Sequence, residues 1–424
     1  MERKSGVLMH ISSLFGDYSS GGFGDEAKYF VDFLAQSGFS YWQVLPFCMV
    51  DECNSPYKSY STFAGNPYFV DLKKLEQKGL LTGDELAAQR QQTPYSCEFV
   101  RLYHTRLQTL MRASERVDNG ERLKIEKFIR DDKYLGKFCE FMTYKAANDE
   151  KPWYEWKNLI IDEKILFMWK FIQYEFFTQW DEIKKYANSK GVGIIGDMPI
   201  YVSHDSCDVW SNKHLFQMDA DNRLTKVAGV PPDYFSADGQ LWGNPLYDWE
   251  KMSKDGYSWW CDRLEHSLKL FDGVRIDHFR GLESYCTVDG DAKTARNGEW
   301  IKGPGLALTE KLTEIAGDKL IIAEDLGDIT EDVVKLVRDS GFPGMRVFQF
   351  AFLGDAKTPH LPHNYENNCV AYSGTHDNNT LLGYLWELTP ETRAHMLEYC
   401  RFRGGDWDRL GCETVIKTLL SSVA

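Results

Sequence analysis

Short apolar runs alternate with helical stretches along this chain, and this alternation is the feature that most restricts its fold. Seven runs have the length and composition of strands that are buried on both faces. Several follow a helical stretch that stops at a glycine, the usual helix stop signal, as at Gly38, Gly191 and Gly341. The pattern predicts parallel strands joined by right-handed crossovers. The seven runs are Gly6–His10, Tyr41–Leu45, Gly193–Met198, Gly273–Ile276, Leu320–Ala323, Met345–Phe348 and Cys369–Tyr372.

The fold class predicted from this order is α/β, a (β/α)8 TIM barrel with helical and loop insertions. A chain of 424 residues can hold a barrel of about 250 residues together with insertions. We expect a single catalytic barrel over residues 1–424, a helical subdomain inserted at 73–164 and an active-site loop insertion at 199–256. Strong helical patterns run over Glu98–Ile129 and Ile165–Lys190. The second insertion is dense in Pro, Gly, Asp and Trp, and a long loop in a compact domain is usually functional.

An eighth strand is missing from this count. After Cys369–Tyr372 the sequence offers two more helical stretches, Glu391–Phe402 and Asp406–Ser422. A barrel needs closure, because an open gap leaves unpaired backbone groups along its edges. The expectation is a barrel that lacks its C-terminal eighth strand, either because one strand escapes the pattern or because the natural chain is longer.

Three of the seven runs are followed by an acid. Asp277 and Glu324 come directly after their runs, and Asp377 lies five residues after Tyr372. The carboxyl ends of parallel barrel strands meet at one face, which carries catalysis in such folds. Two or three carboxylates at that face are typical of chemistry on a glycosidic bond.

The neighbours of the first two acids indicate different roles. Arg275 and Asp277 are two residues apart on a strand, so both point to the same side, and the arginine favours the ionised carboxylate that a nucleophile needs. Glu324 follows an apolar run, where partial desolvation raises a carboxyl pKa and suits a general acid. Taken alone, a structural Arg–Asp pair and a helix-capping acid remain open alternatives.

Composition narrows the classes of partner and cofactor. The net charge of −14 argues against nucleic acid and against an anionic membrane. Aromatic residues make up 14% of the chain, which fits a large core and also fits sugar binding. The ten cysteines form no CxxC pair, and His376 and Asp377 lack a third ligand, so we expect no metal and no cofactor. Scattered thiols and the lack of a long apolar segment favour a cytoplasmic protein. The oligomeric state is left open.

Four longer motifs carry a resemblance to a known family. They are similar to the signatures of 4-α-glucanotransferase, also called amylomaltase or disproportionating enzyme, in glycoside hydrolase family 77. The resemblance runs from the N-terminus to about Thr380. The four motifs are Ser55–Pro67, Gly196–Ile200, Val227–Phe235 and Gly239–Tyr247.

The resemblance implies a retaining glycosyltransferase that moves segments between α-1,4-glucans and maltooligosaccharides, with glucose as an acceptor. It implies that Asp277 is the nucleophile, Glu324 the acid/base and Asp377 a transition-state stabiliser. The segment Val227–Gln240 would arch over the cleft. The implied substrate-binding residues are Tyr57, Asp197, Arg275 and His376 in the first donor subsite, Tyr234 and Trp242 near the acceptor side, and Asn244.

Two alternatives accompany this interpretation. The same carboxylates would serve a retaining α-glucosidase-type hydrolase, because the choice between water and sugar as acceptor does not follow from them. The sequence also departs from the family pattern, since a final strand and an Asn-Trp-Trp-Arg-like terminal stretch are absent. The second alternative is therefore an inactive glucan-binding fragment.

Overall fold

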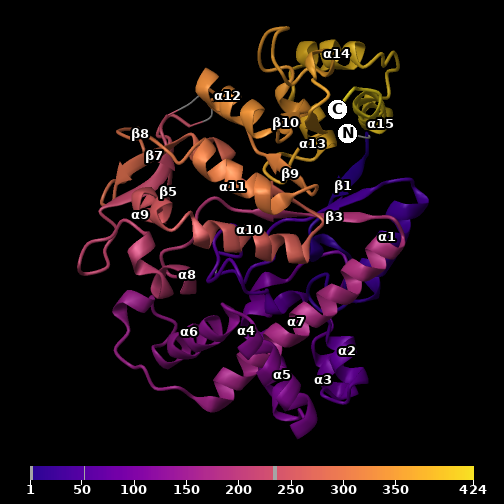
Figure 1. The fold of residues 1–424 in the computed structure, drawn as a ribbon. Helices are drawn as coiled ribbons and strands as arrows, with labels where there is room; N and C mark the ends of the chain where they lie inside the picture. The colour runs from indigo at the N-terminus through magenta and orange to yellow at the C-terminus, as the bar shows by residue number, and fades with distance from the viewer. Residues whose placement is uncertain (1–2, 52, 233–235) are drawn as a thin grey trace.

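A curled parallel sheet of seven strands forms the centre of the molecule in a computed structural model that describes residues 3–51, 53–232 and 236–424 (Figure 1). All seven predicted runs are strands of this sheet, so the prediction of a mixed α/β fold with a parallel sheet is confirmed. The strand order is β1-β2-β3-β6-β9-β10-β11. The strands are β1 (Gly6–Leu8), β2 (Tyr41–Gln43), β3 (Gly193–Met198), β6 (Gly273–Ile276), β9 (Leu320–Ala323), β10 (Gly344–Val347) and β11 (Cys369–Tyr372).

Side-chain contacts show how strongly the sheet curls. Trp42, Val274 and Ile322 are fully buried in its strands, as expected for strands covered on both faces. The Tyr372 hydroxyl of β11 donates to Gln43 Oε1 of β2 at 2.7 Å. Since β2 and β11 lie near opposite ends of the strand order, this bond requires the sheet to bend back on itself. Among the described residues, β1 and β11 each pair with one neighbour.

Helices cover the outside of the sheet. The longest, α7, starts where the Asp162 side chain accepts from two backbone N–H groups, and it ends just before Gly191. Trp180 of α7 is buried, and its indole N–H donates to Leu270 O at 3.0 Å, at the end of α10. The helices that follow the sheet strands are α1 (Asp25–Gln36), α7 (Glu163–Ser189), α10 (Ser258–Leu270), α11 (Leu306–Ala316) and α12 (Glu331–Ser340).

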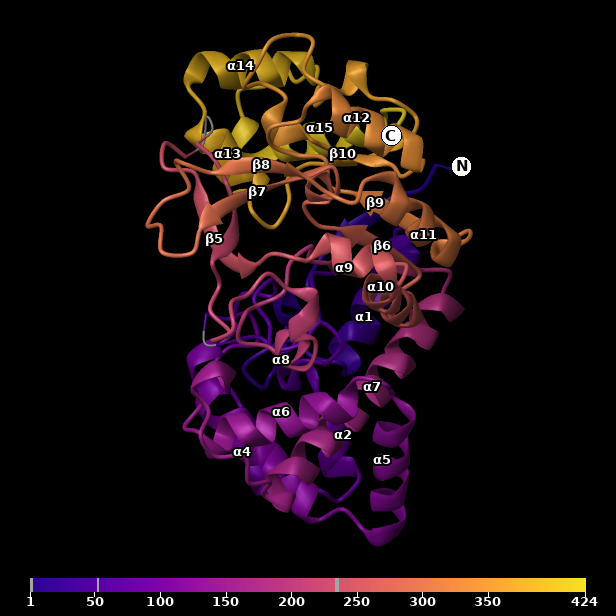
Figure 2. The ribbon, with the colours of Figure 1, turned by 60° about the vertical axis from the view of Figure 1, so that its left-hand side comes forward.

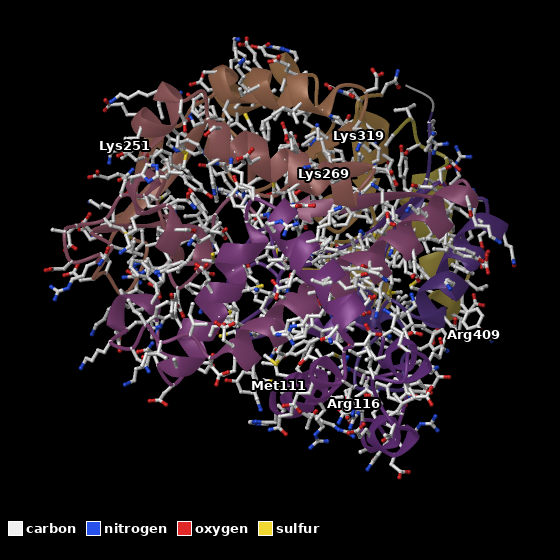
Figure 3. The ribbon with its side chains drawn as sticks, turned by 60° about the horizontal axis from the view of Figure 1, so that its bottom comes forward. Met111, Arg116, Lys251, Lys269, Lys319 and Arg409 are labelled. Carbon is white, nitrogen blue, oxygen red and sulfur yellow. The ribbon has the colours of Figure 1, made fainter. Side chains whose placement is uncertain are left out.

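The long connection between β2 and β3 is largely helical. The predicted stretch Glu98–Ile129 forms two helices, because the Asp118 side chain accepts from Glu121 N and starts a new helix there. Arg116, at the end of the first of these helices, donates to Leu80 O at 2.9 Å and pairs with Glu85; Figure 3 labels it beside Met111. The helices here are α2 (Leu72–Gln77), α3 (Gly83–Ala88), α4 (Phe99–Glu115), α5 (Asn119–Asp131) and α6 (Leu135–Ala147).

The predicted loop insertion contains regular structure that the sequence pattern did not reveal. Two of its segments form an antiparallel hairpin, which extends into a four-stranded sheet of order β5-β4-β7-β8. Every residue of β8, at the edge of this small sheet, is exposed. The elements within the predicted insertion are α8 (Cys207–Ser211), β4 (Lys226–Val230), β5 (Gln240–Pro245) and α9 (Trp249–Lys254). The other two strands of the small sheet, β7 (Ser284–Asp289) and β8 (Glu299–Lys302), follow β6.

Three helices follow β11 and share a small apolar cluster with Phe348. They lie together at one end of the molecule, beside the end of the parallel sheet that carries β10 (Figures 1 and 2). No helix in the described ranges is long and apolar enough to cross a membrane. The three helices are α13 (Leu381–Glu387), α14 (Pro390–Tyr399) and α15 (Trp407–Leu420).

Candidate active site

Arg275 joins three acids at the carboxyl ends of adjacent parallel strands. Its Nη1 lies 2.8 Å from both carboxylate oxygens of Asp197 on β3. Its Nη2 lies 2.9 Å from Asp277 Oδ1 and 3.9 Å from Glu324 Oε2. Asp277 follows β6 and Glu324 follows β9, and β6 pairs with both β3 and β9. The parallel register therefore gathers these four predicted site residues at one edge.

Burial gives this cluster unusual proton affinities. Arg275 and Asp197 expose only 5% and 7% of their surface. The charged hydrogen bonds from Arg275 Nη1 to the two Asp197 oxygens are therefore shielded from water. Burial raises the pKa of Asp277 to about 7, although the Arg275 guanidinium opposes the rise. Burial also raises the pKa of Glu324. Arg275 is closer to Asp277 than to Glu324, so its charge favours ionisation of Asp277.

Two backbone N–H groups hold the Glu324 carboxylate. His278 N donates to Oε2 at 2.6 Å and Leu326 N donates to Oε1 at 2.8 Å. The donor His278 has a left-handed backbone, with φ 47° and ψ 46°. A non-glycine residue in this region is uncommon and carries strain. The residue that follows Asp277 thus aligns the other carboxyl of the pair.

The two distances from Arg275 Nη2 limit the separation of the acids. Asp277 Oδ1 and Glu324 Oε2 can be no more than roughly 7 Å apart, whereas inverting glycosidases separate their carboxyl groups by about 6.5–9.5 Å. Most of the inverting range is therefore closed to these two oxygens, and the spacing favours a retaining arrangement.

Tyr57 and His376 extend the cluster toward the third acid. The Tyr57 hydroxyl donates to Asp197 Oδ2 at 2.6 Å, and its ring stacks on His376 with centroids 5.1 Å apart. Burial raises the pKa of Tyr57, with the Asp197 charge adding to the rise. Asp377 lies beside His376, 3.3 Å from Nε2, and 77% of its side chain is exposed. Within the described residues, Asp377 is thus linked to the other acids through its neighbour His376, and it faces solvent.

Two of the predicted substrate-binding residues, Trp242 and Asn244, lie on the strand β5. The Trp242 ring, 36% exposed, packs edge-on against the His278 ring at 4.8 Å. Asn244 uses its side-chain amide to bond Val202 O at 2.9 Å, so it also positions the loop after β3. Of the predicted covering segment Val227–Gln240, residues 227–230 belong to β4 and Gln240 begins β5, and these two strands pair antiparallel. Tyr234, which was predicted to bind substrate, lies outside the described residues.

Sequence reasoning missed two histidines at this site. His278 directly follows Asp277, but no pattern of residues predicts its left-handed backbone. His10 follows β1, and burial lowers its pKa to about 3, with the nearby His376 adding to this effect. Its position at the end of the apolar run Gly6–His10 was the available signal. No group of three potential metal ligands occurs in the part of the chain that the structure covers.

Known proteins share this architecture and sequence. A family model described as 4-alpha-glucanotransferase matches residues 9–424. The 4-alpha-glucanotransferase of Clostridium butyricum is 44% identical over 98% of this chain and 88% of its own length. That of Thermus thermophilus is 40% identical over 96% of this chain and 84% of its own length.

A solved structure agrees with these sequence matches. The amylomaltase from Streptococcus agalactiae in complex with acarbose superposes with a TM-score of 0.94, at 38% identity, over 100% of this chain and 88% of that chain. A family match across nearly the whole sequence, relatives at 40% identity or more and this superposition agree, and the chain belongs to the 4-alpha-glucanotransferase family.

Proposed function

We propose that this chain transfers segments of α-1,4-linked glucan between maltooligosaccharides, with retention at the anomeric carbon and with glucose among its acceptors. The observation that carries the proposal is the contact of Arg275 with Asp197 and Asp277, next to Glu324. Family membership supports the substrate class. The curled sheet is proposed as part of a (β/α)8 TIM barrel, residues 1–424 as one catalytic unit, and 73–164 and 199–256 as its insertions. The cytoplasm is the proposed location.

In the first step, Glu324 donates its proton to the glycosidic oxygen while an Asp277 oxygen attacks the anomeric carbon. The bond to the leaving glucan breaks, and a covalent glucanosyl ester forms on Asp277. Arg275 suits this step because it favours the ionised nucleophile. The raised pKa of Glu324 suits it because the acid must hold a proton near neutral pH.

In the second step, the 4-hydroxyl of an acceptor glucan attacks the anomeric carbon of the ester. Glu324 accepts the hydroxyl proton, the ester bond breaks, and two inversions give net retention. Asp377 is proposed to accept hydrogen bonds from sugar hydroxyls that strengthen as the ring flattens. Tyr57, Asp197 and His376 would bind the same sugar.

Transfer instead of hydrolysis requires that sugar reaches the ester before water does. Segment 227–240 is proposed to cover the cleft and limit water access. Tyr234 in this segment and Trp242 beyond it are proposed to contact the acceptor, and Asn244 is proposed to bind substrate. The exposed face of Trp242 offers an apolar surface for a pyranose ring.

Incubation with maltotriose as sole substrate tests the function. Transfer yields a ladder of longer oligomers together with glucose and maltose. Glucose and maltose alone would identify a hydrolase, and unchanged maltotriose would identify a binding protein. The anomeric configuration of the first product, read by proton NMR, tests retention separately: an inverted product would refute the role of Asp277.

A further inference from the structure

A rigid aromatic surface lies outside the proposed catalytic cluster. The Tyr154 ring stacks on His204, with centroids 4.4 Å apart and planes inclined by 16°. Trp153 packs edge-on against both rings, and its indole N–H donates to His204 O at 2.7 Å. Tyr154 remains 42% exposed although one face of its ring lies against the histidine. The pair therefore presents an aromatic face that is fixed in place before any ligand binds.

Contacts of Asp205 with Trp153 and with a buried lysine fix the position of this surface. Asp205 accepts from Trp153 N at 3.1 Å and from the buried Lys145 Nζ at 2.6 Å. Lys145 Nζ also lies 4.7 Å above the centre of the Tyr60 ring. Lys145 comes from α6 and Tyr60 from the loop that carries Tyr57, so the helical insertion and the substrate loop are joined here.

The surface lies along the loop that leaves the catalytic cluster. His204 is seven residues after Asp197, so the two Cα atoms are at most about 25 Å apart. Val202, between them, accepts the Asn244 hydrogen bond, and Cys207 N donates to Tyr60 O at 2.8 Å. In Figures 1 and 2 the helix α8, which begins just after this loop, lies between β5 and α6.

The loop that carries Tyr57 is linked to this surface. Tyr60 lies three residues after Tyr57, and its ring faces Lys145, whose Nζ pairs with Asp205. Asp205 in turn accepts from Trp153 N, next to Tyr154. The stretch of chain that reaches the catalytic cluster through Tyr57 is therefore connected to the aromatic surface through Lys145 and Asp205.

We infer that Tyr154, supported by His204, is an outer donor-side subsite for α-1,4-glucans several glucosyl units longer than the catalytic cluster alone can hold. An exposed aromatic face packs against the apolar C–H surface of a pyranose ring, and a rigid ring loses little entropy on binding. This inference rests on the proposed transferase function.

The test compares donors of different length in wild type, Tyr154→Ala and Tyr154→Phe. Initial transfer rates are measured with glucose as acceptor and with maltotriose or maltoheptaose as donor. Tyr154→Ala should raise KM for maltoheptaose by about fivefold to tenfold, the loss expected for one aromatic contact, and leave its kcat unchanged. Its KM for maltotriose should stay within twofold of wild type, and Tyr154→Phe should behave as wild type with both donors.

Tyr29→Ala is the matched control, because Tyr29 is also a surface tyrosine, 61% exposed and stacked on Phe15, but belongs to α1 on another side of the molecule (Figure 1). It should change neither KM. An equal rise in KM for both donors, or no rise for maltoheptaose, would overturn the inference. An effect seen only when the acceptor is lengthened would overturn the donor-side assignment. Failure of the wild-type protein to use maltotriose would instead refute the proposed function.

Discussion

Replacing His278 by valine should break the hydrogen bond that its N–H donates to Glu324, whereas asparagine should preserve it. Both variants lose the imidazole and its contact with Trp242, and the two side chains are similar in size. They differ in their tolerance of the left-handed backbone that His278 adopts. Asparagine enters this region readily, and a β-branched residue is an outlier there. The pair therefore isolates the contribution of the backbone conformation.

The size of the effect follows from two opposing energies. Holding a β-carbon-bearing residue in the left-handed region costs about 1–2 kcal/mol. A hydrogen bond to a charged group contributes about 1.5–3 kcal/mol. Because the two are similar in size and valine adds further crowding, the valine variant should leave the left-handed region and lose the bond. The lost N–H stabilised the carboxylate, so its loss raises the pKa of Glu324, by roughly one to two units.

The assay is the pH dependence of kcat/KM with maltotriose. In the proposed mechanism Glu324 must be protonated to act as the acid, so activity should fall as pH rises through its pKa. We expect the alkaline limb of His278→Val to lie roughly one to two pH units above that of His278→Asn. Coincident alkaline limbs and equal thermal stabilities would refute the reasoning. If the alkaline limbs of the two variants coincide but His278→Val loses about 1–2 kcal/mol in unfolding free energy, the surrounding contacts hold the valine in the left-handed conformation despite its strain.

Three further outcomes are expected. Asp277→Asn should abolish transfer while leaving the melting temperature close to wild type, and retained turnover would exclude Asp277 as nucleophile. Gly65→Ala should lower the unfolding free energy by about 1–3 kcal/mol, because its new methyl group would lie 2.2 Å from the buried Phe176 ring, while the open site Gly83→Ala should cost nothing measurable in urea unfolding. Burial raises the pKa of Asp208 to about 7, so its contribution to stability is complete below pH about 4 and is lost as pH rises through 7. Between pH 4 and pH 8, the unfolding free energy of Asp208→Asn should therefore rise by roughly 2–4 kcal/mol relative to that of wild type. A difference between the two proteins that does not change with pH would contradict the raised pKa of Asp208.

The sequence predicted the part of the site that depends on parallel strand pairing. Asp197, Arg275, Asp277 and Glu324 stand at the ends of runs whose apolar composition marks buried strands, and the register of β3, β6 and β9 brings them together. Such runs are recognisable because both faces must be apolar. Their ends are less certain: the run Gly6–His10 forms a strand only to Leu8.

The antiparallel sheet escaped prediction for a physical reason. All four residues of β8 are exposed, so Glu299–Lys302 has no buried face to produce an alternating pattern. Its conformation depends on pairing with β7, where Cys286 lies opposite Trp300. The left-handed backbone of His278 is equally invisible in sequence, since the contacts that maintain it come from distant segments. These contacts include the Glu324 carboxylate.

The insertion between β2 and β3 bears on the order in which the chain folds. Tyr41 and Gly193 are register partners, yet about 150 residues separate them, compared with roughly 30 in a plain βαβ unit. Closing the longer loop costs about 1.4 kcal/mol more chain entropy, which slows the pairing. Helices α4 to α7 make contacts that are local by comparison, and their prior collapse would shorten the effective loop. We therefore expect the helical insertion to gain protection from hydrogen exchange during refolding before β2 and β3 do.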